Sequence, residues 1–443
     1  MALTKAHTRM IEGDALSVLD YGAVGDGTTD DTTAFQACAD ALVTNGGIMS
    51  VPVGTYKLTA TVNIPGSVVV EGEGNNSLLK FYDAANFHGL SFYGGDWTPS
   101  ISPFEEGGVR DLRIDGSNLT FNLNARGAVR FYIVGHAVCE NVRVENWQGV
   151  GFMLDSSTDV VIRNCYVYRS YEHSVYISGH YATAGYELTG EGGHKILNNT
   201  IVESGYNSGT THMAIKQAND ARNVSIKNNL IIDSTSVAIN AETTVGGTIT
   251  GNAIKGSAQQ AIRLLSTAVG PISISDNTIT DGVVGPIKIE GGADFLISNN
   301  YIKPATSTWA MVCDDMNDSV ITGNIIDGAA TNVYGIDIDG TSSGNLVSGN
   351  TFTNSLTIDL RTVSTTSNNT VINNLGDSIS NGGTRNVFRT KRVGEGTVAP
   401  TAGVWAVGDI TYNSAPAAGG TMGWVCTTAG TPGTWKTFGT ISA

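Results

Sequence analysis

The chain has 443 residues, of which 55 are glycine and only 15% are charged, a composition typical of an all-β protein with many turns. Its formal net charge of −15 argues against a nucleic-acid partner, because binding to phosphates needs a basic surface. No apolar run is long enough to cross a membrane, and the N-terminus lacks the apolar core of a secretory signal. We therefore expect a protein that acts inside the cell, or that leaves it by lysis or as part of a particle.

The five cysteines are scattered along the chain and include no C-x-x-C pair. This spacing argues against a structural zinc site and against a disulfide framework. We therefore expect reduced and mostly buried thiols, and we expect neither a bound metal nor another cofactor.

Residues 21–35, which read YGAVGDGTTDDTTAF, are rich in glycine and carboxylate. A calcium loop of the EF-hand type does not close here, because the glutamate of its twelfth position is missing. A phosphate-binding glycine loop is also unsuited, because Asp30 stands where the third glycine should be and would repel phosphate. We interpret Asp30 or Asp31 as the cap of a helix over residues 32–43, followed over residues 48–58 by a strand that a Pro-Val-Gly turn interrupts.

The stretch LDYGAVGDGTTDDTTAFQACADAL at residues 19–42, followed by GGIMSVPVGTYKL at residues 46–58, resembles the opening module of the pectate-lyase-like right-handed β-helix superfamily. The TK and MIEG segments just before it resemble those of bacteriophage tailspike and tail-fibre proteins. This resemblance implies a right-handed parallel β-helix whose N-terminal end is covered by the short helix. It implies no single reaction, because the superfamily includes lyases, hydrolases, epimerases and adhesins that do not cleave.

Seven arginines gather in residues 110–169, a segment that is near neutral in an otherwise acidic chain. Their guanidinium groups can hold an acidic glycan through bidentate contacts with its carboxylates. The alternative is that each arginine pairs with an acidic residue of a neighbouring coil. From this group we take Arg130, Arg163 and Arg169 as candidate substrate-binding residues.

An asparagine recurs with a near-constant period after residue 160, within segments such as SIKNNLI, TITGNAI and VITGNII. The steps between successive markers are 34, 30, 23, 25, 23, 24, 26 and 24 residues. A period in the twenties with β-type corners predicts a parallel β-helix, in which the asparagines stack and exchange side-chain hydrogen bonds. The markers are Cys165, Asn199, Asn229, Asn252, Asn277, Asn300, Asn324, Asn350 and Asn374.

The first two steps exceed the period by about ten and about six residues, and a solenoid places such insertions as loops on one face, which is often the binding face. The inserted stretch, residues 168–217, contains four of the seven histidines. We expect a catalytic site here. The candidate catalytic residues are His173, His180, His194, His212, Tyr181, Tyr206 and Lys216, and the candidate substrate-binding residues are Tyr176 and Glu187.

Two reactions suit these side chains. β-Elimination of a uronic-acid glycan needs a cation at the carboxylate, a base for the C5 proton and an acid for the leaving oxygen, and Lys or Arg, His and Tyr can fill these roles. Hydrolysis instead needs two carboxylates, which Glu172, Glu187, Glu191 and Glu203 can supply. Because His, Tyr and Lys dominate the insertions, we favour elimination.

The outward positions of the strand that follows each corner form two predicted columns on one face. The first contains Tyr176, Lys216, Asn240, Arg263, Lys288 and Asp337, and the second contains Asp155, Ser178, Glu242, Glu290, Asp314 and Asp339. Asp337 and Asp339 lie about 7 Å apart on one strand and form a second candidate catalytic pair, the alternative being that they are simply exposed acids. We add Asn240 and Arg263 to the candidate substrate-binding residues.

The periodic asparagines end before residue 380. The remaining segment contains three of the six tryptophans in short alternating runs. This pattern predicts a small β-module, which either stacks on sugar or covers the open edge of the last coil. We divide the chain into an N-terminal tail and capping segment over residues 1–80, a right-handed parallel β-helix over residues 81–380, and a linker with a small C-terminal β-module over residues 381–443.

These patterns predict an all-β protein, a right-handed parallel β-helix with a short N-terminal capping helix. The resemblance implies a parallel homotrimer that contacts other phage tail proteins. It would reside in the host cytoplasm before assembly and then in the virion tail, or outside the cell after release. We expect a depolymerase that cleaves bacterial surface or extracellular polysaccharide by β-elimination. The alternatives are a glycoside hydrolase that uses paired carboxylates and a non-catalytic adhesin that binds the same glycan.

Overall fold

A computed structural model describes residues 15–82, 88–93, 107–120, 127–179, 192–206, 212–282, 284–305, 309–328, 334–354, 356, 358–376, 379–381, 387–389, 393–403 and 405–443. Internal contacts divide the chain into two units. The first comprises Met1–Asn369 and Leu375–Asn386, and the second comprises Thr370–Asn374 and Val387–Ala443.

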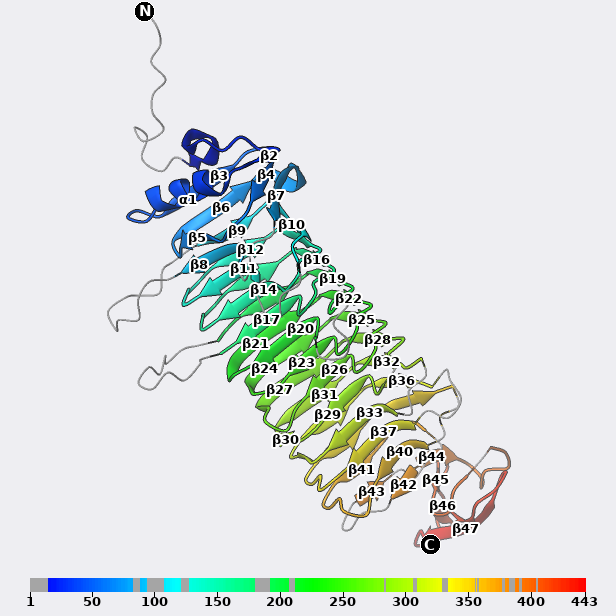
Figure 1. Ribbon diagram of the computed structural model, residues 1–443. Helices are drawn as coiled ribbons and strands as arrows, with labels where there is room; N and C mark the ends of the chain where they lie inside the picture. Colours follow the sequence, from blue (N-terminus) through cyan, green and yellow to red (C-terminus); the bar gives the residue numbers. More distant parts are fainter. Residues whose placement is uncertain are drawn as a thin grey trace, which may run out of the picture. The chain divides into compact units, whose positions relative to one another are not determined.

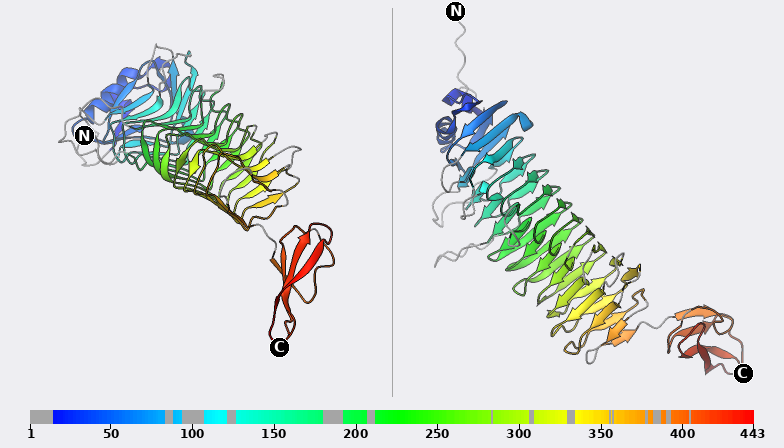
Figure 2. Two further views of the ribbon diagram at one scale, coloured as in Figure 1. Left: turned by 90° about the horizontal axis from the view of Figure 1, so that it is seen from below. Right: turned by 45° about the vertical axis from the view of Figure 1, so that its right-hand side comes forward.

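The first unit is a right-handed parallel β-helix, which confirms the predicted fold. Each coil contributes one strand to each of three parallel sheets, called A, B and C in chain order, and successive coils follow one another from blue to orange in Figure 1. The same stacking is visible from two further sides in Figure 2. Within this unit, residues far apart in the sequence therefore lie side by side on neighbouring strands.

The strands are short and numerous. Sheet A contains β1 (Leu16–Ser17), β3 (Gly47–Val51), β6 (Val68–Gly72), β9 (Gly108–Arg110), β12 (Val138–Glu140), β15 (Val161–Arg163), β18 (Lys195–Leu197), β21 (Ala221–Lys227), β24 (Thr244–Thr250), β27 (Val269–Ser275), β31 (Phe295–Ser298), β35 (Val320–Thr322) and β38 (Leu346–Ser348). Sheet B contains β2 (Asp26–Asp30), β4 (Gly54–Leu58), β7 (Ser77–Tyr82), β10 (Arg113–Asn118), β13 (Arg143–Glu145), β16 (Tyr166–Tyr168), β19 (Thr200–Val202), β22 (Leu230–Ile232), β25 (Ala253–Lys255), β28 (Thr278–Thr280), β32 (Tyr301–Lys303), β36 (Ile325–Asp327) and β39 (Thr351–Thr353).

Sheet C contains β5 (Val62–Pro65), β8 (Leu90–Tyr93), β11 (Gly127–Tyr132), β14 (Val150–Asp155), β17 (Val175–Ser178), β20 (Ile215–Ala218), β23 (Ile239–Ala241), β26 (Ile262–Leu264), β29 (Ile287–Ile289), β33 (Trp309–Asp314), β37 (Tyr334–Asp339), β40 (Ile358–Thr362) and β42 (Ile379–Asn381). A minor pair is formed by β30 (Gly292–Ala293) and β34 (Met316–Asn317).

The core consists of aliphatic side chains that point inward at every second strand position. Ile226, Ile249 and Ile274 stand in register on β21, β24 and β27 and are buried. Burying one such side chain contributes about 1.5–3 kcal/mol, so each coil adds a similar increment to the core. All five cysteines are buried and free, as predicted.

The corner between sheets A and B carries the predicted asparagine ladder. The Nδ2 of Asn252 donates to the Oδ1 of Asn277 at 3.0 Å and to the carbonyl oxygen of Ile226, and its Oδ1 accepts from the backbone amide of Asn229. The same side-chain link runs without interruption from Asn199 to Asn350, so the polar groups of these buried corners are satisfied.

A second ladder, which the sequence pattern did not reveal, occupies another corner. The Nδ2 of Asn345 donates to the Oδ1 of Asn369 at 2.9 Å, and the Oδ1 of Asn345 accepts from the amide of Ser319. Asn345 directly precedes β38 of sheet A, so this ladder lies at the other end of that strand from the predicted one.

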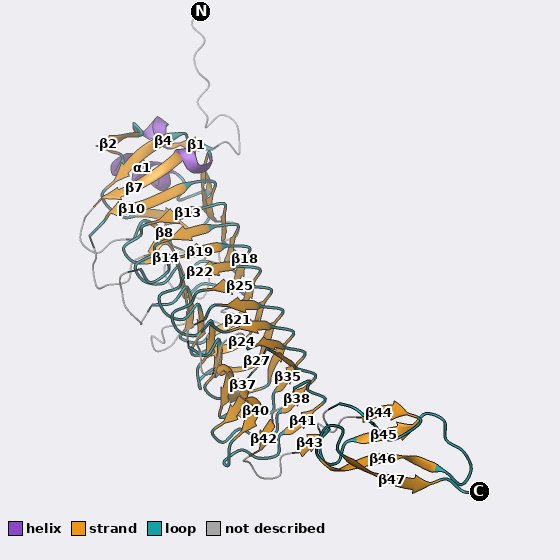
Figure 3. Ribbon diagram, turned by 90° about the vertical axis from the view of Figure 1, so that its right-hand side faces the viewer, coloured by secondary structure: helices purple, strands orange, loops and turns teal. Residues whose placement is uncertain are grey.

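The helical elements lie at the N-terminal end, as Figure 3 shows in purple. α1 (Thr32–Ala41) follows the short 3₁₀ helix η2 (Val18–Tyr21) and packs against β5, and a second 3₁₀ turn, η3, spans Gly74–Asn76. Of the two predicted caps, Asp30 accepts the amide of Thr32 at 3.0 Å, whereas Asp31 accepts the amides of Val24 and Gly25. No helix in these described ranges is long and apolar enough to cross a membrane.

The second unit contains a short parallel pair and a small four-stranded sheet. β41 (Thr370–Ile372) pairs with β43 (Val387–Arg389), and the sheet consists of β44 (Val393–Gly396), β45 (Ile410–Asn413), β46 (Thr421–Thr428) and β47 (Thr434–Thr440). Its last three strands are antiparallel, and Trp405 meets Trp435 edge to face at 5.0 Å. This sheet is the small C-terminal β-module that the sequence predicts.

Candidate functional site

The outer face of sheet C carries the predicted columns. Tyr176 of β17 pairs in register with Lys216, and the same position passes through Asn240, Arg263 and Lys288 on the following strands. Val312 then precedes Asp337, which the sequence pattern had placed directly after Lys288, and Arg361 of β40 follows. In the second column, Asp155 pairs with Ser178 and Asp314 pairs with Asp339.

The two oversized coils place their extra length on both sides of sheet C. The connection between β19 and β20 spans residues 203–214, whereas the next coil uses residues 233–238 for the same connection. The connection between β17 and β18 spans residues 179–194, against residues 219–220 one coil later. The candidates His180, Tyr181 and Glu187, together with Glu191, lie outside the described residues.

One group of aromatic side chains, here called the histidine–tyrosine cluster, consists of His173, Tyr176 and His212. The His173 ring stacks on Tyr176 with centroids 5.4 Å apart and meets His212 edge to face at 5.3 Å. The Nζ of Lys216 lies 6.0 Å from the Tyr176 ring centroid and 3.0 Å from the Oε1 of Glu242. The three cluster residues and Lys216 lie at the start of β17 and β20 or just before it, where the connections from sheet B enter sheet C.

Burial makes the histidines of this cluster weak bases. The Nδ1 of His173 accepts the amide of Met213 at 2.9 Å, so the proton of the neutral ring sits on Nε2. Burial, followed by the positive fields of His212 and Lys216, lowers the pKa of His173 to about 3. Burial also lowers the pKa of His212 and raises the pKa of the neighbouring Glu172 to about 7.

The structure does not bring the other described catalytic candidates into this cluster. His194 precedes β18 of sheet A, where its buried ring accepts the amide of Val160 at 3.2 Å. Tyr206 lies on the sheet B side of the corner, with its ring centroid 5.0 Å from the Arg169 guanidinium. The catalytic roles proposed for His194 and Tyr206 stay predictions.

A second group, here called the aspartate cluster, consists of Asp314, Asp337 and Asp339. Asp337 is only 1% exposed, and Arg361 donates to its two carboxylate oxygens at 2.7 and 2.6 Å. Burial nevertheless raises the pKa of Asp337. Asp314 and Asp339 stand opposite each other on β33 and β37, and the Asp339 side chain is 41% exposed.

The carboxylates of this cluster have different environments. Partial burial, together with the negative charges of Asp315 and Asp339, raises the pKa of Asp314. The adjacent Asp315 accepts the amide and hydroxyl of Thr341 at 2.7 and 2.8 Å, and these bonds lower its pKa. Asp314 therefore holds a proton more readily than an ordinary carboxyl group does, which is the property of a general acid. The sequence columns include Asp314, but only its register against Asp339 makes it a candidate catalytic residue.

Aromatic rings lie at the start of the same two strands. Trp309 stacks on Tyr334 with centroids 4.3 Å apart and planes 25° apart. The Arg361 guanidinium, which binds Asp337, lies 4.3 Å from the Trp309 ring centroid. Flat aromatic faces beside carboxylates provide both stacking and polar contacts for a sugar ring. In the described part of the chain, no three His, Cys, Asp or Glu side chains are grouped so that they could hold a metal ion.

The six described arginines of residues 110–169 all lie in ion pairs, which confirms the alternative that coils stack arginine against acid. The pairs are Arg110–Glu71, Arg113–Glu145, Arg130–Asp155, Arg143–Glu145, Arg163–Glu140 and Arg169–Glu203. Arg263 likewise pairs with Glu290, and the buried Asn240 donates to Glu242 at 3.2 Å. Contact of any of these residues with a glycan stays a prediction.

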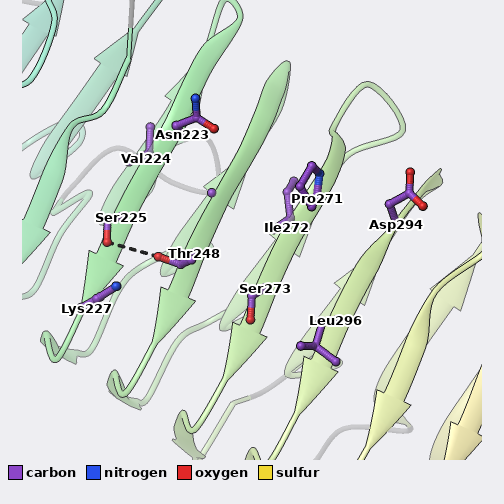
Figure 4. A pocket seen from close by; sticks show the side chains of 11 residues that line it. Asn223, Val224, Ser225, Lys227, Thr248, Pro271, Ile272, Ser273, Asp294 and Leu296 are labelled. Carbon is purple, nitrogen blue, oxygen red and sulfur yellow. Dashed lines mark hydrogen bonds between the residues drawn. The ribbon is translucent and has the colours of Figure 1, made fainter.

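Sheet A has a groove of about 540 Å³ on its outer face, which crosses β21, β24, β27 and β31. Figure 4 shows Ser225, Thr248 and Ser273 along its floor, with Lys227 and Asp294 at opposite ends. Its hydroxyl groups can donate and accept hydrogen bonds. Because the two charged groups stand far apart, they do not form an acid–base pair, and we place the candidate chemistry on sheet C.

Two family models match the chain. The model described as rhamnogalacturonase A/epimerase, pectate lyase-like, matches residues 15–287, and the model described as right handed beta helix region matches residues 213–391. The first match covers more than half of the chain and includes the histidine–tyrosine cluster. The second follows sheet C from β20 to β42 and includes the aspartate cluster.

Individual proteins are similar over shorter stretches. The plasmin and fibronectin-binding protein A of Streptococcus pneumoniae is 31% identical over 173 residues, which are 38% of this chain and 23% of that protein. The pre-neck appendage protein of Bacillus phage phi29 is 28% identical over 138 residues, 30% of this chain and 15% of that protein. The chain thus spans less than a quarter of either relative.

A solved structure shows the same fold. It is a mutant tailspike protein of E. coli bacteriophage HK620 in complex with a pentasaccharide. Its TM-score is 0.60 at 11% identity, and the match covers 84% of this chain and 78% of that one.

Proposed function

The chain belongs to the rhamnogalacturonase A/epimerase, pectate lyase-like family, and from this premise we propose that it cleaves a polysaccharide by hydrolysis on the outer face of sheet C. The observation that carries the proposal is the pair of opposed carboxylates, Asp314 and Asp339, on two strands that begin with the stacked rings of Trp309 and Tyr334. Hydrolysis of a glycosidic bond needs two carboxyl groups in different protonation states, and the raised pKa of Asp314 supports such a division.

Each carboxyl group has a defined task in this proposal. Asp314 donates its proton to the glycosidic oxygen as the bond to the anomeric carbon breaks. Asp339 attacks or stabilises the anomeric carbon from the other side, and water then completes the hydrolysis. Neighbouring strands lie about 4.8 Å apart, which is closer to the separation of about 5–5.5 Å in retaining glycosidases than to the wider inverting one. We therefore expect retention of the anomeric configuration.

The surrounding side chains orient the substrate. The rings of Trp309 and Tyr334 offer a stacking surface at the other end of the same two strands. Arg361 is held between Asp337 and Trp309, so its guanidinium is fixed in position next to the pair. A fixed donor loses little conformational entropy when it binds a sugar hydroxyl.

The test compares the wild type with Asp314→Asn and Asp339→Asn on crude capsular and extracellular polysaccharides. We expect new reducing ends from the wild type, without ultraviolet absorbance from an unsaturated product, and a loss of at least about a hundredfold in each variant. Asp318→Asn is the matched control, because Asp318 lies outside the cluster and asparagine tolerates its left-handed backbone (φ 46°). Unchanged cleavage by either cluster variant would refute the assignment.

Elimination at the histidine–tyrosine cluster is the second candidate, and it is favoured by His212 next to Lys216. Burial, followed by the positive charge of Lys216, lowers the pKa of His212, which keeps the imidazole neutral and able to accept a proton. This route predicts an unsaturated product that absorbs ultraviolet light and whose formation is lost in His212→Ala. An absorbing product that persists in Asp314→Asn would favour this route over hydrolysis.

We further propose a phage tail setting with a parallel homotrimer, which the similarity to a phage pre-neck appendage protein supports. The similarity to a streptococcal binding protein supports the remaining alternative, an adhesin that holds glycan without cleaving it. Binding to a polysaccharide without any new chain ends would identify the protein as such an adhesin. Sedimentation of the full chain tests the trimer.

A further inference from the structure

The outer face of sheet B carries a group of arginines and tyrosines that the chemistry on sheet C does not use. Arg113, Arg143 and Tyr166 stand in register on β10, β13 and β16, and Tyr168 lies two residues along the last strand. Arg169 and Tyr206 continue the group at the corner that follows. We call these six residues the arginine–tyrosine patch.

In this patch the carboxylate of Glu145 lies beneath the more exposed guanidinium groups of Arg113 and Arg143. Arg113 and Arg143 both bind Glu145, through Nε–O distances of 2.6 and 2.5 Å. The Glu145 side chain is 6% exposed, whereas those of Arg113 and Arg143 are 36% and 38% exposed. Two guanidinium groups thus share one buried carboxylate. Asp115 and Lys80 continue the row of Glu145 in register, so three cations stand against two carboxylates on this face, an excess of one positive charge.

The guanidinium planes are also held by aromatic rings. Arg143 lies 4.4 Å from the Tyr166 ring centroid, and Arg169 lies 4.9 and 5.0 Å from those of Tyr168 and Tyr206. Arg169 also binds Glu203 through its Nε at 2.6 Å. Such fixed guanidinium groups retain N–H donors for a planar anion, and adjacent tyrosine rings can stack on the apolar face of a sugar.

We propose that the arginine–tyrosine patch is a second polysaccharide-binding site, which takes acidic sugar units and anchors the polymer on sheet B while sheet C processes it. Its anionic ligand is inferred from the excess of cations over carboxylates. From β10 to β19 the patch spans three strand spacings, about 14 Å, which accommodates a short run of sugar units. That the ligand is the same polymer rests on the proposed function; the binding of an acidic saccharide does not.

The test measures binding of polygalacturonate and of neutral dextran to the full chain by affinity electrophoresis. We expect the wild type to be retarded by polygalacturonate but not by dextran, and the retardation to decrease with salt. The double variant Arg143→Gln/Arg169→Gln removes two cations and keeps hydrogen-bonding side chains, and we expect it to bind at least about tenfold more weakly. Arg143→Lys/Arg169→Lys, which keeps the charge but not the planar fork, should lose less.

The matched control is Arg222→Gln, which removes an exposed arginine from β21 of sheet A. Equal weakening in this control, equal binding of dextran, or no binding by the wild type would each overturn the proposal. Thermal unfolding of each variant reports whether the fold is retained. Polygalacturonate binding is measured apart from the release of reducing ends, so a failure of the hydrolytic assignment and a failure of the patch give different results.

Discussion

Arg361 and Asp337 form a two-pronged ion pair across β37 and β40, with N···O distances of 2.7 and 2.6 Å. The pair fully engages the buried Asp337 carboxylate, although the sequence pattern placed this residue in a catalytic pair with Asp339. Asp314, on the other side of β37, is the carboxylate left opposite Asp339. The ion pair therefore fixes the floor of the aspartate cluster, and Asp314 and Asp339 form its exposed part.

Arg361→Gln should destabilise the protein, because it leaves the buried Asp337 without its cation. We expect the free energy of unfolding to fall by about 3–5 kcal/mol, as measured by denaturant titration. The double variant Asp337→Asn/Arg361→Gln should recover most of this loss, since neither buried charge remains. Equal destabilisation in the single and double variants would show that packing against Trp309 matters more than the charge.

Gly340→Ala should reduce cleavage by displacing Asp314. Gly340 has a φ of +61°, and an added Cβ would overlap the Oδ1 atoms of Asp314 and Asp315. Gly344→Ala is the matched control, because it has a φ of +75° and would overlap the Oδ1 of Asp318 instead. Both variants should lose about 1 kcal/mol of stability, but only Gly340→Ala should lose activity by about tenfold or more. Equal activities would argue against a catalytic Asp314.

Asn252→Ala should weaken the whole solenoid through one corner. It removes the hydrogen bonds to Asn229, Asn277 and the Ile226 carbonyl and leaves their buried polar groups unsatisfied. We expect a loss of about 2–4 kcal/mol in the free energy of unfolding. Lys255→Ala, an exposed change in the same coil, should have little effect and serves as the control.

His194 should make the protein sensitive to acid. Burial lowers its pKa to about 4, below its ordinary value of 6.5, so its contribution to stability is complete above pH 6.5 and is lost as the pH falls toward 4. In His194→Asn, which can still accept the Val160 amide, the fall in unfolding free energy between pH 7 and pH 4.5 should be smaller by about 2–3 kcal/mol. Parallel pH profiles for the two proteins would contradict this.

The sequence predicts the fold well because successive coils of the solenoid repeat a similar residue pattern. From Asn199 to Asn350, each corner between sheets A and B holds an asparagine that satisfies its neighbours, so Asn252 and its counterparts mark these coils, and this periodicity also gives their strand register. Tyr176, Lys216, Asn240 and Arg263 can therefore be aligned from the repeat alone. The position of Val312 between Lys288 and Asp337 was missed because the intervening coil has no charged residue at that position.

The candidate site was harder to predict because composition does not reveal burial or pairing. Four histidines close together in the sequence suggested one site, yet His194 faces sheet A while His173 faces sheet C. Because the chain turns at each corner of a coil, residues of one short stretch of sequence lie next to different sheets. Conversely, Asp314 and Asp339 are 25 residues apart in the sequence and become neighbours only through the register of β33 and β37.

Because the asparagine ladder is unbroken, distances along the solenoid come in multiples of one coil. The histidine–tyrosine and aspartate clusters are separated by six strand steps, from β17 to β37, or about 29 Å. Deleting residues 253–277, one complete turn, would bring Asn300 into the place of Asn277 and shorten this span by a single step of about 4.8 Å. A deletion that does not match a whole turn would break the ladder. The distance between the two clusters can therefore change only in steps of one turn.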